Sequence, residues 1–447
     1  MNTNLSKPGV VWLKHTWNLV HNPFPSGGVA RLGGRDDREN GLLFRPEVQQ
    51  EKVDQAINKF ILGTAYQGLK FGYLWSVGGG LGGDVRGYGK SSMLQFLVER
   101  VNDDFGRGML IGAGLDDNDA DDHPLAAVLS SFDMANARSL SAVFFEGARY
   151  ACRFHVGDNP TLATRLYQRL VERAGTTDRE RLVVLVNEGA QSVLGRTLGP
   201  PIAEFVALLC SGDPAPVGEY MENVKTGARA RVGAANYLAT FLHFAKAAGV
   251  EHVLLGCDQL EDFAATTTTK AKRTIEVERF RDYVLELQPM ADMLTCLVTL
   301  HPRAEQAIGE MWRLADLPNF APDRAENESR IVVLEPIEDH ERAKSLLKPY
   351  LDAARTAPAA EGQPFSPFTD ETIKMLLDRS NGKPRDLLLK AHALIEKGSS
   401  LNWDRIDGVR AVGVLDSFTE PDLEFAAEFS GQSARSIGPS TTEELWI

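Results

Sequence analysis

The sequence predicts an α/β fold built on a parallel sheet, and three observations favour this fold class. An apolar run at residues 73–77 is followed by a glycine-rich loop and then by residues 90–105, which have helical periodicity. Further apolar runs that can form strands lie at 108–115, 251–258, 293–301 and 330–337. The segments between these runs are mostly helical in pattern, as expected when successive strands lie parallel.

The composition is that of a globular protein. Of the 447 residues, 43% are hydrophobic and 24% are charged, and this length suggests about three structural units. No uncharged apolar run reaches the roughly 18 residues of a membrane span, and residues 1–17 lack a signal-peptide core. We therefore expect no membrane partner and a cytoplasmic location.

The cysteine spacing argues against disulfides and zinc sites, and the net charge argues against general binding to nucleic acid. The four cysteines are far apart in the chain and form no C-x-x-C pair, so they are expected to be isolated buried thiols in a reducing compartment. The net charge of −13 argues against indiscriminate binding to nucleic acid, although it allows a local basic face.

Four regions are expected along the chain. They are an N-terminal linker and helix (1–70), a core (71–355) with a helical insertion at about 135–248, a helical lid (356–420) and a flexible acidic tail (421–447). Residues 356–369, rich in proline and alanine, are expected to form a linker or long loop.

The glycine-rich stretch "GGGLGGDVRGYGKSSMLQFL" (78–97) nearly matches a phosphate-binding loop, G-x-x-x-x-G-K-[ST]. Lys90 would reach the β- and γ-phosphates of a nucleotide, and the Ser91 hydroxyl would ligate Mg²⁺. Asp84 stands at the first glycine position, so either Gly83 or Gly82 makes the first turn, or Asp84 points outward and pairs with Arg86. The alternative is a glycine-rich turn without a ligand. The candidate binding residues are Gly83, Arg86, Gly87, Tyr88, Gly89, Lys90, Ser91 and Ser92.

A second candidate site follows the apolar run at 251–258. Asp258 ends this run and could hold Mg²⁺ through water. The alternative is an aspartate without a metal role, because many strands end in Asp. The next residue is Gln259, and an amide can orient a water molecule but cannot act as a general base. Glu261 and Asp262 are close enough in sequence to take that role.

Two further polar positions come later in the chain. Thr299 or His301, at the end of the run 293–301, could lie between a γ-phosphate and Asp258; an ordinary polar strand end is the alternative. In "SNGKPRDLL" (380–388), a turn with Gly382 precedes a helix that starts at Pro384. Arg385, in the first turn of that helix, could reach the γ-phosphate or could be a surface cation.

The acidic stretch "LDDNDADDHP" (115–124) does not fit a calcium loop. Counted from Asp117, acids fall at positions 1, 3 and 5, but the glycine position holds Asp122 and the last ligand position holds Val128. We expect a solvated acidic loop.

Together these residues resemble an AAA+ ATPase over roughly residues 20–400. The chain is most similar to the initiator and origin-recognition clade and to its prokaryotic relatives, including ATPases of transposons and phage-defence operons. "VRGYGKSS" resembles the phosphate loop of that clade and "NGKPRDLLLKA" its second sensor. "NPFP" resembles the linker that touches adenine, which implies that Asn22, Pro23 and Phe24 contact the base.

The resemblance also implies assembly with an arginine supplied by a neighbouring subunit. Arg330, just before the last expected strand, matches that position; Arg324 and Arg313 are alternatives. Basic clusters at 225–231 and 270–273 could face a nucleic-acid backbone or could be solvated surface. Asp84 and Gln259 depart from the family pattern, and we expect no winged-helix domain in the 62 residues that follow Arg385.

These observations lead to two functional hypotheses. The first is a P-loop NTPase of AAA+ type that binds ATP and Mg²⁺ and forms a nucleotide-dependent homo-oligomer. It would act on DNA or on a DNA-processing complex, with a nuclease or another operon-encoded protein as partner, in phage defence or a mobile element. The second is a nucleotide-dependent protein-interaction module that hydrolyses ATP slowly or not at all. Gln259 leaves the hydrolytic activity open.

Overall fold

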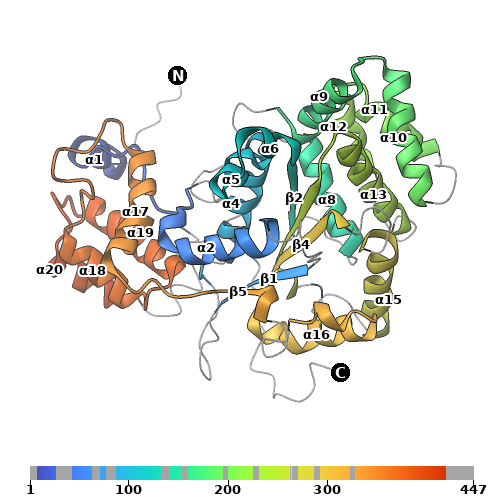
Figure 1. Cartoon of the computed structure of the whole chain (residues 1–447). Helices are drawn as coiled ribbons and strands as arrows, with labels where there is room; N and C mark the ends of the chain where they lie inside the picture. Colours follow the sequence, from blue (N-terminus) through green and yellow to red (C-terminus); the bar gives the residue numbers. More distant parts are fainter. Residues whose placement is uncertain are drawn as a thin grey trace. The chain divides into compact units, whose positions relative to one another are not determined.

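The protein has an α/β fold with a five-stranded parallel sheet in the order β2-β3-β4-β1-β5 (Figure 1). The structure is a computed structural model. It describes residues 8–26, 43–62, 71–76, 87–131, 140–153, 160–194, 200–224, 231–261, 263, 270–285, 292–322 and 328–418.

The strands are short and almost wholly buried, as expected of a parallel sheet covered on both faces. Four of the five predicted strand positions are confirmed. The five strands are β1 (Phe71–Ser76), β2 (Leu125–Ser131), β3 (His252–Asp258), β4 (Leu294–Thr299) and β5 (Ile331–Leu334).

The predicted strand at 108–115 is wrong. Its first part forms a short helix, α5 (Arg107–Gly112), and the second strand, β2, begins at Leu125 instead. The acidic stretch before β2 is mostly exposed to solvent, as predicted, but it contains the helix α6 (Asp117–Asp122) instead of being only a loop. The Asp116 carboxylate caps α6 by accepting a hydrogen bond from the Asp119 N–H at 2.9 Å.

The chain forms two compact units. The first unit comprises Met1–Val53, Ser76–Met93 and Val333–Ile447, and the second comprises Asp54–Trp75 and Leu94–Val332.

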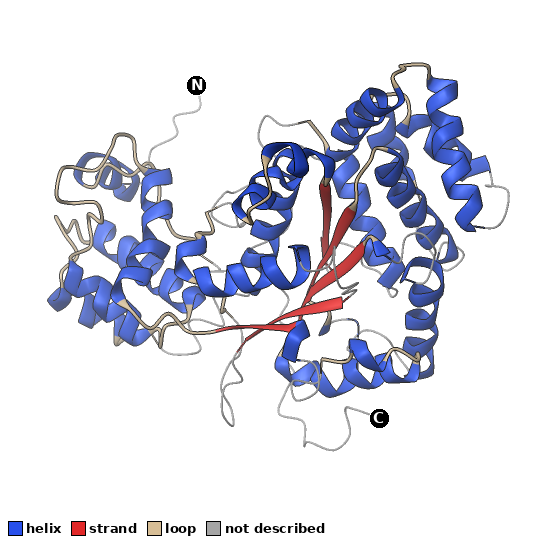
Figure 2. Cartoon of the chain, viewed as in Figure 1, coloured by secondary structure: helices blue, strands red, loops and turns tan. Residues whose placement is uncertain are grey.

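The second unit holds most of the sheet and the large helical insertion. The helix α8 packs against β2 and β3, and α12 and α13 pack in turn on α8 (Figure 2). The helices of the insertion are α8 (Leu140–Arg153), α9 (Leu162–Ala174), α10 (Arg179–Leu194), α11 (Pro200–Leu209), α12 (Pro214–Asn223) and α13 (Arg231–Ala247). After β3 come α15 (Lys270–Phe280), a π-helix (Arg281–Leu285) and, beyond β4, α16 (Glu305–Leu314). The described residues between β2 and β3 are therefore mostly helical, and whether they form an insertion into a family core stays a prediction.

The first unit combines both ends of the chain around one hydrophobic core. Leu13, Trp17 and Phe24 from the N-terminal segment are buried together with the apolar faces of four later helices. The helices of this unit are α1 (Pro8–Thr16), α17 (His340–Ala354), α18 (Asp370–Arg379), α19 (Pro384–Ser400) and α20 (Gly408–Leu415). Residues 356–369 form turns between α17 and α18, in agreement with the predicted loop.

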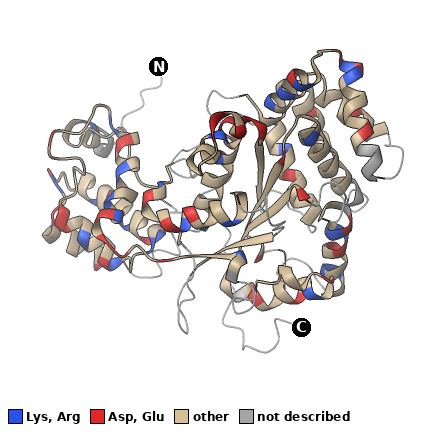
Figure 3. Ribbon diagram, viewed as in Figure 1, with Lys and Arg blue, Asp and Glu red and all other residues tan. Residues whose placement is uncertain are grey.

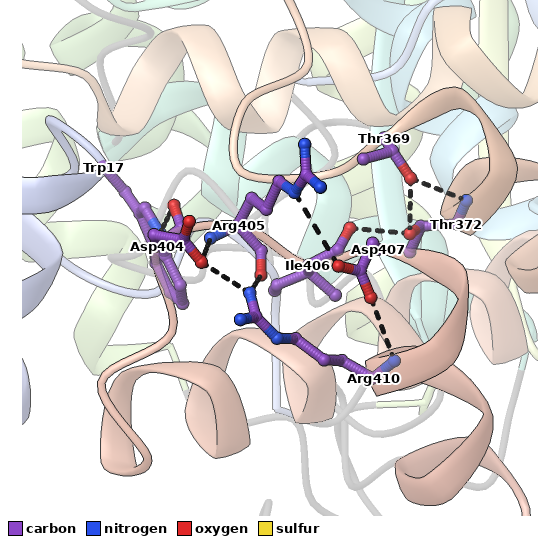
Figure 4. Close-up of polar contacts among 8 residues, drawn as sticks. All are labelled: Trp17, Thr369, Thr372, Asp404, Arg405, Ile406, Asp407 and Arg410. Atoms are coloured by element: carbon purple, nitrogen blue, oxygen red, sulfur yellow. Dashed lines mark hydrogen bonds and ion pairs between the residues drawn. The ribbon is translucent and has the colours of Figure 1, made fainter.

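Two indole groups join the N-terminal segment to the turn between α19 and α20. Trp12 donates to the carbonyl of Trp403 at 3.0 Å. Trp17 donates to the carbonyl of Asp404, also at 3.0 Å (Figure 4). The Arg410 guanidinium holds the same turn by donating to the Asp404 carboxylate and the Arg405 carbonyl. Because these donors bind consecutive carbonyls, the N-terminal segment is a structural part of the C-terminal helical region.

Candidate phosphate-binding site

The described part of the glycine-rich loop is a turn that two glycines make possible. Gly87 and Gly89 have φ angles of +88° and +89°, which side chains other than glycine rarely adopt. A Cβ atom on Gly87 would also lie 2.7 Å from the Arg385 Cβ, whereas a Cβ atom on Gly89 would have nothing within 4 Å. Both glycines are therefore required by conformation, and Gly87 also by the close approach of Arg385.

Lys90 lies at the start of α4 (Lys90–Asn102), directly after this turn. Its Nζ donates a hydrogen bond to the Ser76 hydroxyl at 3.2 Å, and Ser76 is the fully buried last residue of β1. The side chains of Ser91 and Ser92 are half-buried in the first turn of α4. An ammonium group beside a helix N-terminus is a favourable place for an anion. The sequence analysis missed Ser76, for which a serine at the end of an apolar run was the only signal.

Arg385 lies beside the same turn. The helix α19 starts with Pro384, as predicted, and its N-cap residue Lys383 makes no side-chain cap. Instead, the Gly87 carbonyl accepts a hydrogen bond from the Arg385 backbone N–H at 3.0 Å. The glycine turn thus satisfies one of the backbone donors that a helix start leaves without an intrahelical partner.

The segment that contains Asn22, Pro23 and Phe24 is buried in the first unit. The Asn22 amide donates to the His392 carbonyl and to the Glu396 carboxylate, both at 3.0 Å, and Phe24 is 0% exposed in the core. These contacts fix the segment against α19. Contact of these residues with adenine stays a prediction.

In the second unit, Asp258 and Thr299 meet where β3 and β4 end. The Thr299 hydroxyl donates to the Asp258 carboxylate at 2.6 Å and accepts from the Gln259 N–H at 2.8 Å. Asp258 is 8% exposed and Thr299 is 2% exposed. A short bond from a hydroxyl to a carboxylate is a strong one, so Thr299 fixes the orientation of the carboxylate.

The two residues proposed to act on water lie beside this pair. Gln259 has a φ of +63°, which is uncommon for a residue with a side chain, and it is half-buried. The Glu261 carboxylate accepts a hydrogen bond from the His301 N–H at 3.2 Å. The pairing of β3 with β4 therefore brings together Asp258, Gln259, Glu261 and Thr299, the predicted residues of the 251–261 and 293–301 segments.

Arg330, the candidate for supply to a neighbouring subunit, is half-buried in the second unit. Its guanidinium lies 5.8 Å from the centroid of the Phe320 ring, and burial lowers its pKa. Its buried Nη1 has no hydrogen-bond partner among the residues that the structure describes. Arg313, an alternative, lies in the last turn of α16. The role of either arginine stays a prediction.

Basic and acidic residues are mixed on α15, the helix that carries the predicted basic cluster at 270–273. On α15, Lys270, Lys272 and Arg273 are followed by Glu276, which pairs with Arg279 at 3.0 Å (Figure 3). The helix α6 carries a run of acidic residues. Several predicted residues lie outside the described part of the chain: Gly82, Gly83, Asp84, Arg86, Lys225, Arg229, Asp262 and Arg324, together with the tail at 421–447.

The prediction of isolated, buried cysteines is confirmed, and the predicted reducing compartment stays a prediction. All four cysteines are buried and none is in a disulfide, and burial raises the pKa of the Cys257 thiol. Within the described residues, no three His, Cys, Asp or Glu side chains gather as a metal cluster. No helix of the described chain is both long and apolar enough to cross a bilayer.

Comparison with models of protein families, with curated proteins and with solved structures gives no significant match.

Proposed function

We propose that this chain is a P-loop nucleotide-binding protein of the AAA+ type that binds ATP with Mg²⁺. The observation that carries the proposal is the bond from Lys90, the first residue of α4, to Ser76, the last residue of β1. A G-x-G-K-S sequence is a meaningful phosphate-loop signal only between a strand and a helix, and β1 and α4 supply that context.

The strand order supports the same function, because it is consistent with a P-loop-like core. The strands β1 and β4 are neighbours in the sheet. After β1 the chain crosses the sheet in one direction to β2, and after β4 it crosses in the opposite direction to β5. In open α/β sheets, ligands bind outside the carboxyl ends of the strands at such a switch point. Ser76 and Thr299 are the last residues of these two strands.

The chemistry of the residues fits a magnesium nucleotide. The glycine turn, the α4 N-terminus and Lys90 offer backbone N–H groups and an ammonium to phosphate oxygens. The Ser91 hydroxyl and the Asp258 carboxylate are the hard oxygen ligands that Mg²⁺ prefers. Bound Mg²⁺ would neutralise charge on the phosphates, and Arg385 would add a cation next to the glycine turn.

We further propose that the protein hydrolyses ATP. Gln259 would orient the attacking water, Thr299 would hold Asp258 toward the metal, and Glu261 would accept a proton. Arg330 of a neighbouring subunit would complete the site, so that nucleotide promotes a homo-oligomer. The partner would be DNA or a DNA-processing complex, such as an operon-encoded nuclease in phage defence or a mobile element.

The alternative is a slow or inactive nucleotide-dependent module that regulates a partner enzyme. Two observations favour it: Gln259 stands where a general base is usual, and the net charge is −13. In that case ATP would bind and drive assembly with little turnover.

Steady-state hydrolysis of ATP with Mg²⁺, measured with and without DNA, separates the two functions. The first function predicts turnover that DNA stimulates and that Lys90→Ala abolishes. Nucleotide binding without turnover in either condition would favour the regulatory module. Turnover that survives in Lys90→Ala would show a contaminating ATPase and would leave the proposed activity without support.

A further inference from the structure

Gln49 occupies a buried position between a short 3-10 helix (Pro46–Val48) and α2 (Gln50–Ala56). Its backbone carbonyl accepts hydrogen bonds from the N–H groups of Lys52 and Val53, in the first turn of α2. Its side chain is only 8% exposed, although glutamine is a residue type usually found at the surface.

Both donors of the Gln49 amide are used on backbone carbonyls of distant segments. Nε2 donates to the carbonyl of Tyr88 at 3.3 Å and to the carbonyl of Glu335 at 3.1 Å. Only the NH₂ end of the amide can serve two carbonyl acceptors, so this chemistry fixes the orientation of the side chain. Tyr88 stands between Gly87 and Gly89, in the centre of the turn that precedes Lys90.

The second carbonyl belongs to a chain segment that leads back to the same turn. Glu335 follows β5 and pairs with Lys52 at 3.1 Å. Two residues later, the Ile337 N–H donates to the Gly382 carbonyl at 2.7 Å. Gly382 lies just before α19, whose Arg385 N–H donates to Gly87. The glycine turn is therefore held from two sides. Gln49 binds it directly through Tyr88, and the segment after β5, which Gln49 also binds, contacts the start of α19 beside Gly87.

We propose that Gln49 is a positioning residue that holds the Gly87–Gly89 turn in its phosphate-binding conformation before nucleotide arrives. This inference rests on the proposed nucleotide function. Glycines allow many backbone conformations, so an unrestrained turn loses entropy when it closes around phosphate. A turn restrained in advance by Gln49 avoids part of that loss, and the result is tighter binding.

The test compares Gln49→Met with a matched control, Thr372→Val. Methionine keeps the length of the side chain but has no N–H donor. Thr372, 0% exposed in α18, donates its hydroxyl to the Ile406 carbonyl at 2.7 Å (Figure 4). The control thus also removes a buried side-chain bond to a carbonyl in the first unit, but away from the glycine turn.

Calorimetric titration of the full chain with ATP and Mg²⁺ should show about tenfold weaker binding for Gln49→Met and an unchanged Kd for Thr372→Val. Hydrogen exchange without nucleotide should be faster at residues 88–91 in Gln49→Met only. The KM for ATP should rise while kcat stays close to the wild-type value, because the bond acts before chemistry.

The outcomes are distinguishable. If the wild type and Thr372→Val bind ATP and Gln49→Met binds within twofold of them, the positioning role is wrong and the nucleotide function stands. If both variants weaken binding equally, Gln49 acts only through general stability, and the positioning role is again wrong. If the wild type binds no nucleotide, both the proposed function and the positioning role of Gln49 are wrong.

Discussion

The Gly87 carbonyl accepts a hydrogen bond from the Arg385 backbone N–H at 3.0 Å, across 298 positions of sequence. The same glycine has no Cβ, and the Arg385 side chain fills the space that a Cβ would need. The first turn of α19 is therefore built directly on the glycine turn before α4. A change in either residue should affect both elements.

Replacement of Gly87 by alanine tests this contact. The left-handed conformation alone should cost about 1–2 kcal/mol, and the 2.7 Å approach to Arg385 adds a steric penalty. Gly89→Ala is the matched control, since its φ is the same within one degree and no atom lies near its Cβ. We expect the midpoint of thermal unfolding to fall more for Gly87→Ala than for Gly89→Ala.

A second variant separates strain from crowding. Arg385→Gly removes the Cβ that would clash, so Gly87→Ala should cost less in that background than in the wild type. Equal losses for the two alanine variants, in both backgrounds, would show that Arg385 does not restrict Gly87.

Thr299 should be essential for its hydroxyl rather than for its shape. Thr299→Val keeps the volume but removes the donor to Asp258 and the acceptor for the Gln259 N–H. We expect a loss of about 1.5–3 kcal/mol in unfolding free energy, typical of a bond to a charged group, and a loss of ATP hydrolysis. Thr299→Ser should retain most of both. A fully active valine variant would contradict the assigned role.

Gln259→Glu tests the water-orienting role of the amide. If Gln259 only orients water, a carboxylate there should raise the hydrolysis rate by supplying a base. A lower rate would show that Glu261 already accepts the proton or that the amide is required. Asp258→Asn should lose activity in either case, because it weakens the interaction with the metal.

Assembly is tested with Arg330→Ala. A trans arginine in other phosphoryl-transfer sites contributes roughly 10³–10⁵ in rate, so this variant should bind ATP but not hydrolyse it. Mixing it with Lys90→Ala should restore some activity, since each variant supplies what the other lacks. Sedimentation of the wild type should show larger species when a non-hydrolysable ATP analogue is present. Equal sedimentation with and without the nucleotide would reject assembly.

The pair of His123 and Glu251 should respond to pH. The hydrogen bond with Glu251 raises the pKa of His123 above its usual 6.5. The stabilisation is therefore complete below the unfolded-state pKa and disappears as the pH rises through the folded-state pKa. In Glu251→Gln, an NMR titration should show the pKa of His123 shifted down toward 6.5. An unchanged value would mean that the pair does not form in solution.

Elements that have both an apolar pattern and a clear start or stop signal could be predicted from the sequence. The run before the glycine loop, the segment ending at Asp258 and the turn before Pro384 each combine an apolar pattern with a clear stop or start signal, and each forms the predicted element. Asp258 and Thr299 meet because parallel strands in register bring their carboxyl ends to one edge.

The position of the second strand could not be predicted from the sequence pattern. "GMLIGAGL" and "LAAVLSS" are both short apolar runs, and periodicity cannot separate a buried strand from a short helix at that length. Pairing with β3, in which Leu125 lies beside His252, selects the second run. The role of Gln49 was equally hidden, because its partners are backbone carbonyls 39 and 286 positions away.

Thermal unfolding with ATP and Mg²⁺ is the most direct test of nucleotide binding by this protein. If Lys90 and the glycine turn bind phosphate only in the folded state, ATP at about 100 times Kd should stabilise the protein by roughly 2.7 kcal/mol. Lys90→Ala should abolish the shift in midpoint. A wild-type melting curve unchanged by millimolar ATP would contradict the nucleotide-binding function.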